Sequence, residues 1–238
     1  MPRELIQIHV QPHTSYSGHS IASQLGWEID CKFLRQIHYE EDRVRCGPGC
    51  HWSDLIKELN AHGKSPRTMQ SYCSFSVGGT LAVNAHGITT DFCFAESVLE
   101  FRLARITAKG NAKVVVCRPN PEDGKKSLSG DLFSLALGGY GLFGVITEVL
   151  LKVEDNVQLE LNTMQLKVQP TDDVHEDIQP SEFVRIYDNC RNSNGVGDDE
   201  SSGLGKVELK LARLNTVNLE KASFYVFRRS FSSSTVSE

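Results

Sequence analysis

Apolar and polar residues alternate in several short stretches of this chain, which predicts strands with one buried face. The spacing of two appears first in residues 6–10 and again in residues 99–103. A β-branched run at 114–116 follows the turn-forming segment 109–111, so residues 99–116 are predicted to form a hairpin. The apolar, β-branched segment 145–153 predicts a longer, mostly buried strand.

Two other stretches predict short helices. The turn at 47–49 precedes a helix that Ser53 is expected to cap and that Gly63 is expected to end. After a loop rich in Pro, Gly and charge at 119–130, residues 131–137 form a second apolar helical segment.

The chain is long enough for more than one hydrophobic core. Its 238 residues suit one large domain, or one domain and part of a second. The pattern changes near Glu154, so we expect a first domain at 1–153 and a second at 154–238. Within the second, the polar and Gly-rich segment near 192–206 is expected to be a mobile loop.

The segment 139–144 (GYGLFG) matches the spacing G-x-G-x-x-G, which is typical of dinucleotide-binding turns. That turn needs a strand before it and a helix after it, so that the helix N-terminus receives the pyrophosphate. Here a helical pattern precedes the glycines and a strand pattern follows them. A nicotinamide site is therefore disfavoured, and either a structural turn or a close approach to another ligand remains open.

The segment 75–87 (FSVGGTLAVNAHG) mixes small and hydroxyl-bearing residues with apolar ones. Consecutive backbone N–H groups beside glycines can form a nest for phosphate oxygens, to which Ser76, Thr80 and Asn84 could add hydrogen bonds. The alternative is a bulged strand with two ordinary turns. A third candidate is His19 in 17–20 (SGHS), as a flavin attachment point, a general base or a turn residue.

Taken in order, these segments resemble the FAD-binding domain of the family that includes vanillyl-alcohol oxidase and p-cresol methylhydroxylase. The resemblance runs over residues 6–153 and is strongest at 75–87 and 138–153, with a weaker similarity at 183–227 to the start of a substrate or cap domain. It implies an α+β fold in which an incomplete first subdomain is followed by a second α+β subdomain. It also implies that the SGHS and SVGG segments hold the FAD pyrophosphate and that the Gly-Val-Ile segment lies near the adenine end. The cofactor-binding residues implied are Gly18, His19, Ser20, Ser76, Val77, Gly78, Gly79, Asn84, Gly87, Gly144, Val145 and Ile146.

The resemblance also implies a chemistry. Relatives transfer a hydride from a hydroxyl-bearing small molecule, such as a sugar alcohol or lactone, to FAD, and some bind the flavin covalently through the His of the turn, here His19. No catalytic base can be assigned, because His86, Arg185 and Lys210 all have ordinary structural explanations. The strand and helix that open the family's first subdomain are not found ahead of residue 6, so a fragment that no longer binds FAD productively is the alternative.

Composition and charge limit the classes of molecule that the chain is expected to bind. A net charge of −5 and a pI near 5.9 disfavour a nucleic-acid surface, and no apolar run suggests a membrane span or a signal peptide. Seven cysteines in no paired pattern favour a reducing compartment such as the cytoplasm. Cys46, Cys50 and His51 would make only half of a zinc site, so no metal is expected. The expected partner is a small-molecule substrate.

Overall fold

The computed structural model describes residues 8–11, 27–87, 93–167, 207–214 and 221–229 of the chain. The chain divides into two compact units, residues 1–156 and residues 157–238. No helix in these described ranges has the length and apolar character needed to cross a bilayer. The elements are β1 (Ile8–Gln11), β2 (Trp27–Asp30), β3 (Ile37–Glu40), β4 (Arg43–Cys46), α1 (Trp52–Asn60), β5 (Lys64–Pro66), α2 (Val77–Ala82), α3 (Phe94–Ser97), β6 (Val98–Ile106), β7 (Ala112–Cys117), α4 (Leu128–Ala136), β8 (Val145–Asp155), β9 (Leu159–Lys167), β10 (Val207–Leu214) and β11 (Lys221–Arg229).

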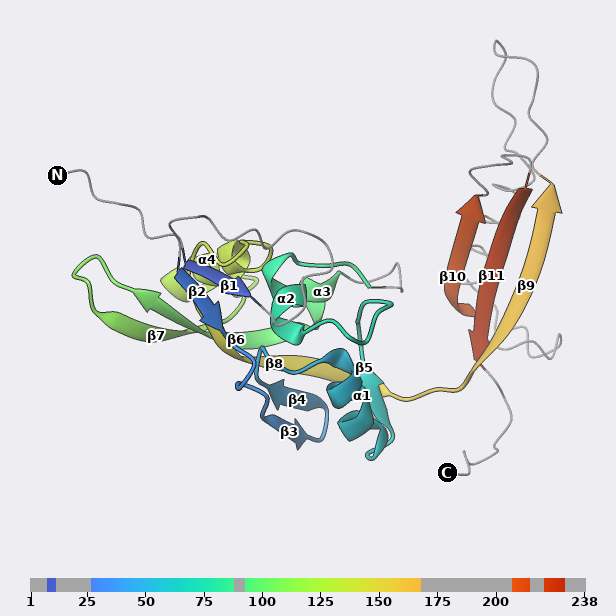
Figure 1. The fold of residues 1–238 in the computed structure, drawn as a ribbon, viewed down its shortest axis with the longest axis horizontal. Coiled ribbons are helices and arrows are strands. Elements are labelled where there is room, and N and C mark those ends of the chain that lie inside the picture. Colours follow the sequence, from blue (N-terminus) through green and yellow to red (C-terminus); the bar gives the residue numbers. More distant parts are fainter. Residues whose placement is uncertain (1–7, 12–26, 88–92, 168–206, 215–220, 230–238) are drawn as a thin grey trace, which may run out of the picture. The chain divides into compact units, whose positions relative to one another are not determined.

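The first unit is built on a six-stranded sheet in which every pairing is antiparallel (Figure 1). Its strands follow the order β3-β4-β8-β6-β7, and β5 pairs with β8 outside this path. The eleven-residue β8 therefore pairs with three strands. A separate parallel pair joins β1 to β2, and the second unit contains the antiparallel sheet β10-β11-β9.

The hydrophobic core of the first unit lies on one face of the six-stranded sheet. Alternate strand residues such as Val44, Phe101 and Val149 point into it, since successive side chains of a strand point to opposite faces. All four helices add to the same core, with Trp52 of α1 and Phe94 of α3 in edge-to-face contact at 5.4 Å. The short helices α2 and α3 are neighbours on this side (Figure 1).

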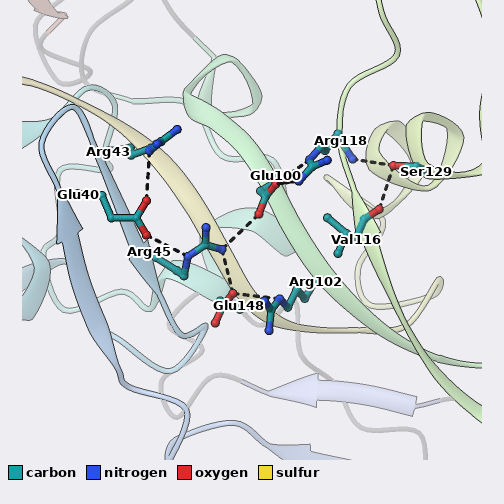
Figure 2. Close-up of polar contacts among 9 residues, drawn as sticks. All are labelled: Glu40, Arg43, Arg45, Glu100, Arg102, Val116, Arg118, Ser129 and Glu148. Atoms are coloured by element: carbon teal, nitrogen blue, oxygen red, sulfur yellow. Dashed lines mark hydrogen bonds and ion pairs between the residues drawn. The ribbon is translucent and has the colours of Figure 1, made fainter.

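The opposite face of the sheet carries charged side chains that join four strands. Arg45 of β4 is at the centre of this group (Figure 2). Its Nη1 lies 3.0 Å from Glu148 Oε1 on β8 and 3.2 Å from Glu100 Oε1 on β6, and its Nε lies 3.3 Å from Glu40 Oε1 on β3. Arg118, just after β7, pairs with Glu100 at 2.7 Å. Because Arg45, Glu100 and Glu148 are at most a quarter exposed, these pairs are less screened by water than ordinary surface pairs.

The predicted strands are confirmed where the structure describes them. Residues 8–11 form β1, the hairpin is β6 and β7, and the buried strand is β8. Both predicted helices begin earlier than expected. Helix α1 starts at Trp52 because the N–H groups of Trp52 and Ser53 donate to the carbonyls of Phe75 and Cys73, and α4 starts at Leu128 because the Ser127 hydroxyl accepts the Gly130 N–H at 3.0 Å.

The segment 75–87 does not form the bulged strand considered from the sequence. It contains the six-residue helix α2, with Ser76 as its N-cap, and no strand runs through it. Two consecutive glycines are poor helix formers, each costing about 1 kcal/mol relative to alanine, so contacts from distant residues must hold this helix.

Candidate functional site

A small crevice of about 30 Å³ lies between α2, the end of α4 and the turn that leads into β8. A crevice of this size has room for water, and a larger ligand would contact only its walls. Two of the segments predicted to bind FAD meet here, since Gly78 comes from the first and Gly144 and Ile146 come from the second. The full set of lining residues is Pro48, Gly78, Ala82, Ala136, Gly141, Phe143, Gly144 and Ile146.

The backbone at the start of α2 is already hydrogen-bonded within the protein. The N–H of Val77 donates to Cys50 O at 2.9 Å, that of Gly78 to Pro48 O at 2.8 Å, and that of Gly79 to the Ser76 hydroxyl at 3.1 Å. A nest needs N–H groups that are free to meet an anion. In this conformation the segment instead offers a surface with little side chain, along which another molecule can approach the main chain.

Glycine at position 78 has a packing explanation as well. A Cβ atom there would lie 2.7 Å from the Cβ of Pro48 and 2.9 Å from its carbonyl oxygen. Pro48 belongs to the turn between β4 and α1 and lines the crevice. The sequence predicted this turn but not its place in the crevice. The missing side chain lets α2 lie directly on this turn.

The glycine run 138–144 closes the other end of α2. Gly138 N–H donates to Leu81 O at 3.0 Å, and Tyr140 N–H donates to Ala82 O at 2.9 Å, so two carbonyls at the C-terminal end of the helix are satisfied. Gly138 and Gly141 have φ values of 73° and 77°, which glycine adopts without strain. The run follows α4 and precedes β8, which confirms that it is not a nicotinamide-binding turn.

The last glycine of that run and the two residues after it pack against strand β6 of the sheet. Gly144 has φ of 141°, and a Cβ atom on it would lie 2.5 Å from Ala104 O. Val145 and Ile146 then pair with Ala104 and Leu103 of β6, and both are buried. Ile146 therefore reaches the crevice from a rigid strand.

The other predicted cofactor residues have different surroundings. Ser76 and Val77 are buried, and the Ser76 hydroxyl caps α2. Asn84 is exposed with φ of 42°, and its Oδ1 accepts the Ala95 N–H at 3.2 Å. Gly79 and Gly87 are half-buried, while Gly18, His19 and Ser20 lie outside the described residues. The structure thus brings Gly78, Gly144 and Ile146 together in the crevice.

Thr80 does not face a ligand, contrary to the expectation from its hydroxyl. Its side chain is 2% exposed, and its Oγ1 accepts the indole N–H of Trp52 at 2.9 Å. The same oxygen lies 2.7 Å from Gln70 Oε1 and 3.0 Å from Ser76 O, either of which can take its hydrogen. Sequence reasoning could not find this role, because the partner Trp52 is 28 positions away.

The crevice walls carry no ionisable side chain among the lining residues described. Two thiols, those of Cys46 and Cys50, lie on either side of the turn that contains Pro48. A hydrogen bond to Cys50 and burial raise the pKa of Cys46 well above its usual value, so this thiol stays protonated at neutral pH. In the part of the chain that the structure describes, no three His, Cys, Asp or Glu side chains gather as metal ligands.

The crevice offers apolar contacts to the edge of a ligand and no group suited to proton transfer. The base candidates do not change this view: His86 is exposed, with Nδ1 3.0 Å from Gly87 O, Arg185 lies outside the described residues, and the structure describes only the backbone of Lys210. Walls of glycine and alanine let a flat ring approach the backbone without displacing side chains. The crevice is therefore a candidate binding site.

A family model described as an FAD binding domain matches residues 8–115. Among curated proteins, the chain is 33% identical over 149 residues to cytokinin dehydrogenase 4 of Oryza sativa subsp. japonica and 31% identical over 138 residues to cytokinin dehydrogenase 2 of Arabidopsis thaliana. This match and these relatives indicate that the matched part of the chain is an FAD-binding domain of the p-cresol methylhydroxylase type. Its cofactor is FAD, and the matched region includes both 18–20 and 76–87.

The alignments to these two dehydrogenases cover only part of each protein. They include 58% of this chain and 26% of the rice protein, and 55% and 25% for the Arabidopsis protein. An uncharacterized oxidoreductase from the fasciation locus of Rhodococcoides fascians is 26% identical over 142 residues, which is 58% of this chain and 30% of that protein. The chain thus spans about a quarter of the length of these relatives.

Proposed function

We propose that this chain holds FAD for a flavin-dependent oxidoreductase that oxidises a hydroxyl-bearing small molecule, such as a sugar alcohol or lactone. The observation that carries the proposal is the crevice in which Gly78 meets Gly144 and Ile146. These residues come from two segments that the family resemblance assigns to FAD. When bound, the flavin supplies the acceptor for a hydride from the substrate carbon.

The chain's own residues would bind and orient the cofactor. Gly78 and Ala82 on α2 and Gly144 and Ile146 at β8 would contact the apolar adenine portion, since the crevice between them is uncharged. Ser76 and Gly79 would shape the start of α2, and Gly18, His19 and Ser20 would face the pyrophosphate. Residues 154–238 would begin a substrate or cap domain. Asn84, Gly87, Val77 and Val145 complete the proposed set.

The visible spectrum of the purified chain tests FAD binding. We expect the two absorption bands of an oxidised flavin, either as purified or after incubation with FAD, and a higher unfolding temperature in the presence of FAD. A colourless protein that FAD neither reconstitutes nor stabilises would contradict the proposal. That result would favour the alternative, a non-catalytic or decayed fragment of such a flavoprotein.

The substrate is tested separately on protein that has been shown to bind FAD. Sugar alcohols, lactones and, because of the names of the relatives, cytokinins are added without oxygen, and bleaching of the flavin absorbance is followed. Bleaching by sugar alcohols or lactones supports the proposed substrate class. Bleaching by cytokinins alone would replace that class, and no bleaching by any of them would argue that the chain binds FAD without oxidising these compounds.

We also propose His19 as the covalent attachment point of the flavin. Acid precipitation separates the outcomes, because a covalent flavin stays with the denatured protein. Loss of pellet flavin in His19→Ala, but not in His38→Ala, would support attachment at His19. Release of all flavin from the wild-type pellet would exclude a covalent bond.

A further inference from the structure

Thr80 sits at the centre of a buried chain of hydrogen bonds that links α2 to the start of α1. Trp52 Nε1 donates to Thr80 Oγ1 at 2.9 Å, and Thr80 Oγ1 lies 2.7 Å from Gln70 Oε1. Trp52 is fully buried and Thr80 is 2% exposed. Since buried polar groups cost free energy unless they are paired, removing the Thr80 hydroxyl would leave the indole N–H without this acceptor.

Helix α2 depends on such links, because it is too short to be stable by itself. It has six residues, and two of them are glycines. Its ends are held by Cys50, Pro48 and the glycine run, as described above. Each of those contacts is made by the backbone, whereas the Thr80 hydroxyl is a side-chain link to Trp52 in the core.

Thr80 and the crevice lie on different sides of α2. Gly78 and Ala82 are four residues apart, so they share one side of the helix, and both line the crevice. Thr80 is two residues from each of them, which is rather more than half a turn. A rotation of α2 about its axis would therefore move Gly78 and Ala82 relative to Gly144 and Ile146 across the crevice.

We propose that Thr80, held by Trp52, is a positioning residue for FAD: it fixes the rotation of α2 and thereby the crevice wall formed by Gly78 and Ala82. This inference rests on the proposed function. It assigns to Thr80 a role through the protein core, in place of a contact with the phosphates. Trp52 has the same positioning role, because its indole N–H donates the hydrogen bond to Thr80.

The test compares FAD affinity in variants of the full chain, measured by flavin fluorescence during titration of the apoprotein. Thr80→Val keeps the shape of the side chain and removes the hydroxyl, and Thr80→Ser keeps the hydroxyl. The matched control is Thr68→Val, because Thr68 is 3% exposed and its hydroxyl pairs at 3.0 Å with that of Ser97, away from the crevice. Thermal unfolding of each apoprotein measures the loss of stability.

We expect Thr80→Val to weaken FAD binding on the order of tenfold, because α2 would then leave the binding-competent rotation and FAD binding would have to restore it. Thr80→Ser should stay within about threefold of wild type, since it loses only a methyl group. Thr68→Val should lose similar stability and keep wild-type affinity. If Thr80→Val is too unstable to titrate, Trp52→Phe removes the donor instead and is expected to weaken FAD binding as well.

The outcomes separate the inference from the proposed function. Wild-type FAD affinity in Thr80→Val, or an equal loss of affinity in Thr68→Val, would overturn the positioning role. Failure of Thr80→Ser to restore binding would overturn it too. If the wild-type chain itself binds no FAD, the proposed function fails instead.

Discussion

Gly78 lies so close to Pro48 that a Cβ atom on Gly78 would be 2.7 Å from the Cβ of Pro48. The backbone bond from Gly78 N–H to Pro48 O, at 2.8 Å, holds the two residues together. This contact attaches α2 to the turn between β4 and α1, and both residues line the crevice.

Gly78→Ala is therefore expected to destabilise the protein and weaken FAD binding, although alanine is the better helix former. Overpacking of this kind costs about 1–3 kcal/mol. Urea unfolding and FAD titration measure the two effects. Gly63→Ala is the control: its φ of 68° makes the substitution strained, but no atom lies within 4 Å of the added Cβ, so FAD affinity should not change. Unchanged stability in Gly78→Ala would contradict the close packing, and unchanged affinity would show that this packing does not affect FAD binding.

Gly144→Ala should have a larger effect on stability than an ordinary strained glycine. Its added Cβ would lie 2.5 Å from Ala104 O in β6, and its φ of 141° is unfavourable for alanine. Gly110→Ala provides the comparison, since it has φ of 81° and open space around the Cβ. The comparison is of unfolding free energies. An equal loss in both variants would show that backbone strain alone, and not contact with β6, requires glycine at 144.

The strands and the hairpin could be predicted because their pattern is local. In β6 and β7, alternating residues and the Gly110 turn lie within a short stretch, so no distant contact is needed to specify them. The start of α1 could not be placed in this way. It depends on carbonyls of Cys73 and Phe75, which only the folded chain brings near Trp52.

The crevice could also be predicted only in part, because it is formed by residues that are distant in the sequence. Gly78, Gly144 and Ile146 could be named from the resemblance, but Pro48, Ala82 and Ala136 are small apolar residues that carry no chemical signal in a sequence. Thr80 was wrongly expected to contact a ligand, because a hydroxyl beside two glycines is typical of a phosphate-binding segment. Its burial against Trp52 is a tertiary effect.

Ser76→Ala is expected to weaken FAD binding by loosening the start of α2. The Ser76 hydroxyl accepts the Gly79 N–H at 3.1 Å, and loss of such a cap costs about 1 kcal/mol. Ser127→Ala is a close match, since Ser127 caps α4 through the Gly130 N–H at 3.0 Å. Thermal unfolding should show similar losses for the two variants. FAD titration should separate them, and equal affinities would show that the α2 cap does not affect the crevice.

Arg45 lies between two carboxylates on the charged face of the sheet, so its removal should destabilise the protein in a pH-dependent way (Figure 2). Burial alone would raise the pKa of Glu100, but hydrogen bonds from Arg118 and Arg45 outweigh it and hold the pKa below the usual 4.5. Because the folded state favours the ionised form, Glu100 stabilises the fold above its unfolded pKa. This stabilisation is lost as the pH falls through the folded pKa.

Arg45→Met would leave Glu100 and Glu148 without their shared partner. We expect a loss of about 1–3 kcal/mol in unfolding free energy at neutral pH. The difference from wild type should shrink as the pH falls below 4.5 and through the lowered pKa of Glu100, because that carboxyl group then takes up a proton and no longer needs the guanidinium. Arg43→Met is the control, because Arg43 lies on the same strand, is 49% exposed and pairs with Glu40 at 3.2 Å. Such pairs contribute at most about 1 kcal/mol, so urea unfolding at both pH values should show a small effect there. Equal losses in the two variants, or a difference from wild type that does not change with pH, would mean that Arg45 acts through packing of its alkyl chain and not through its charge.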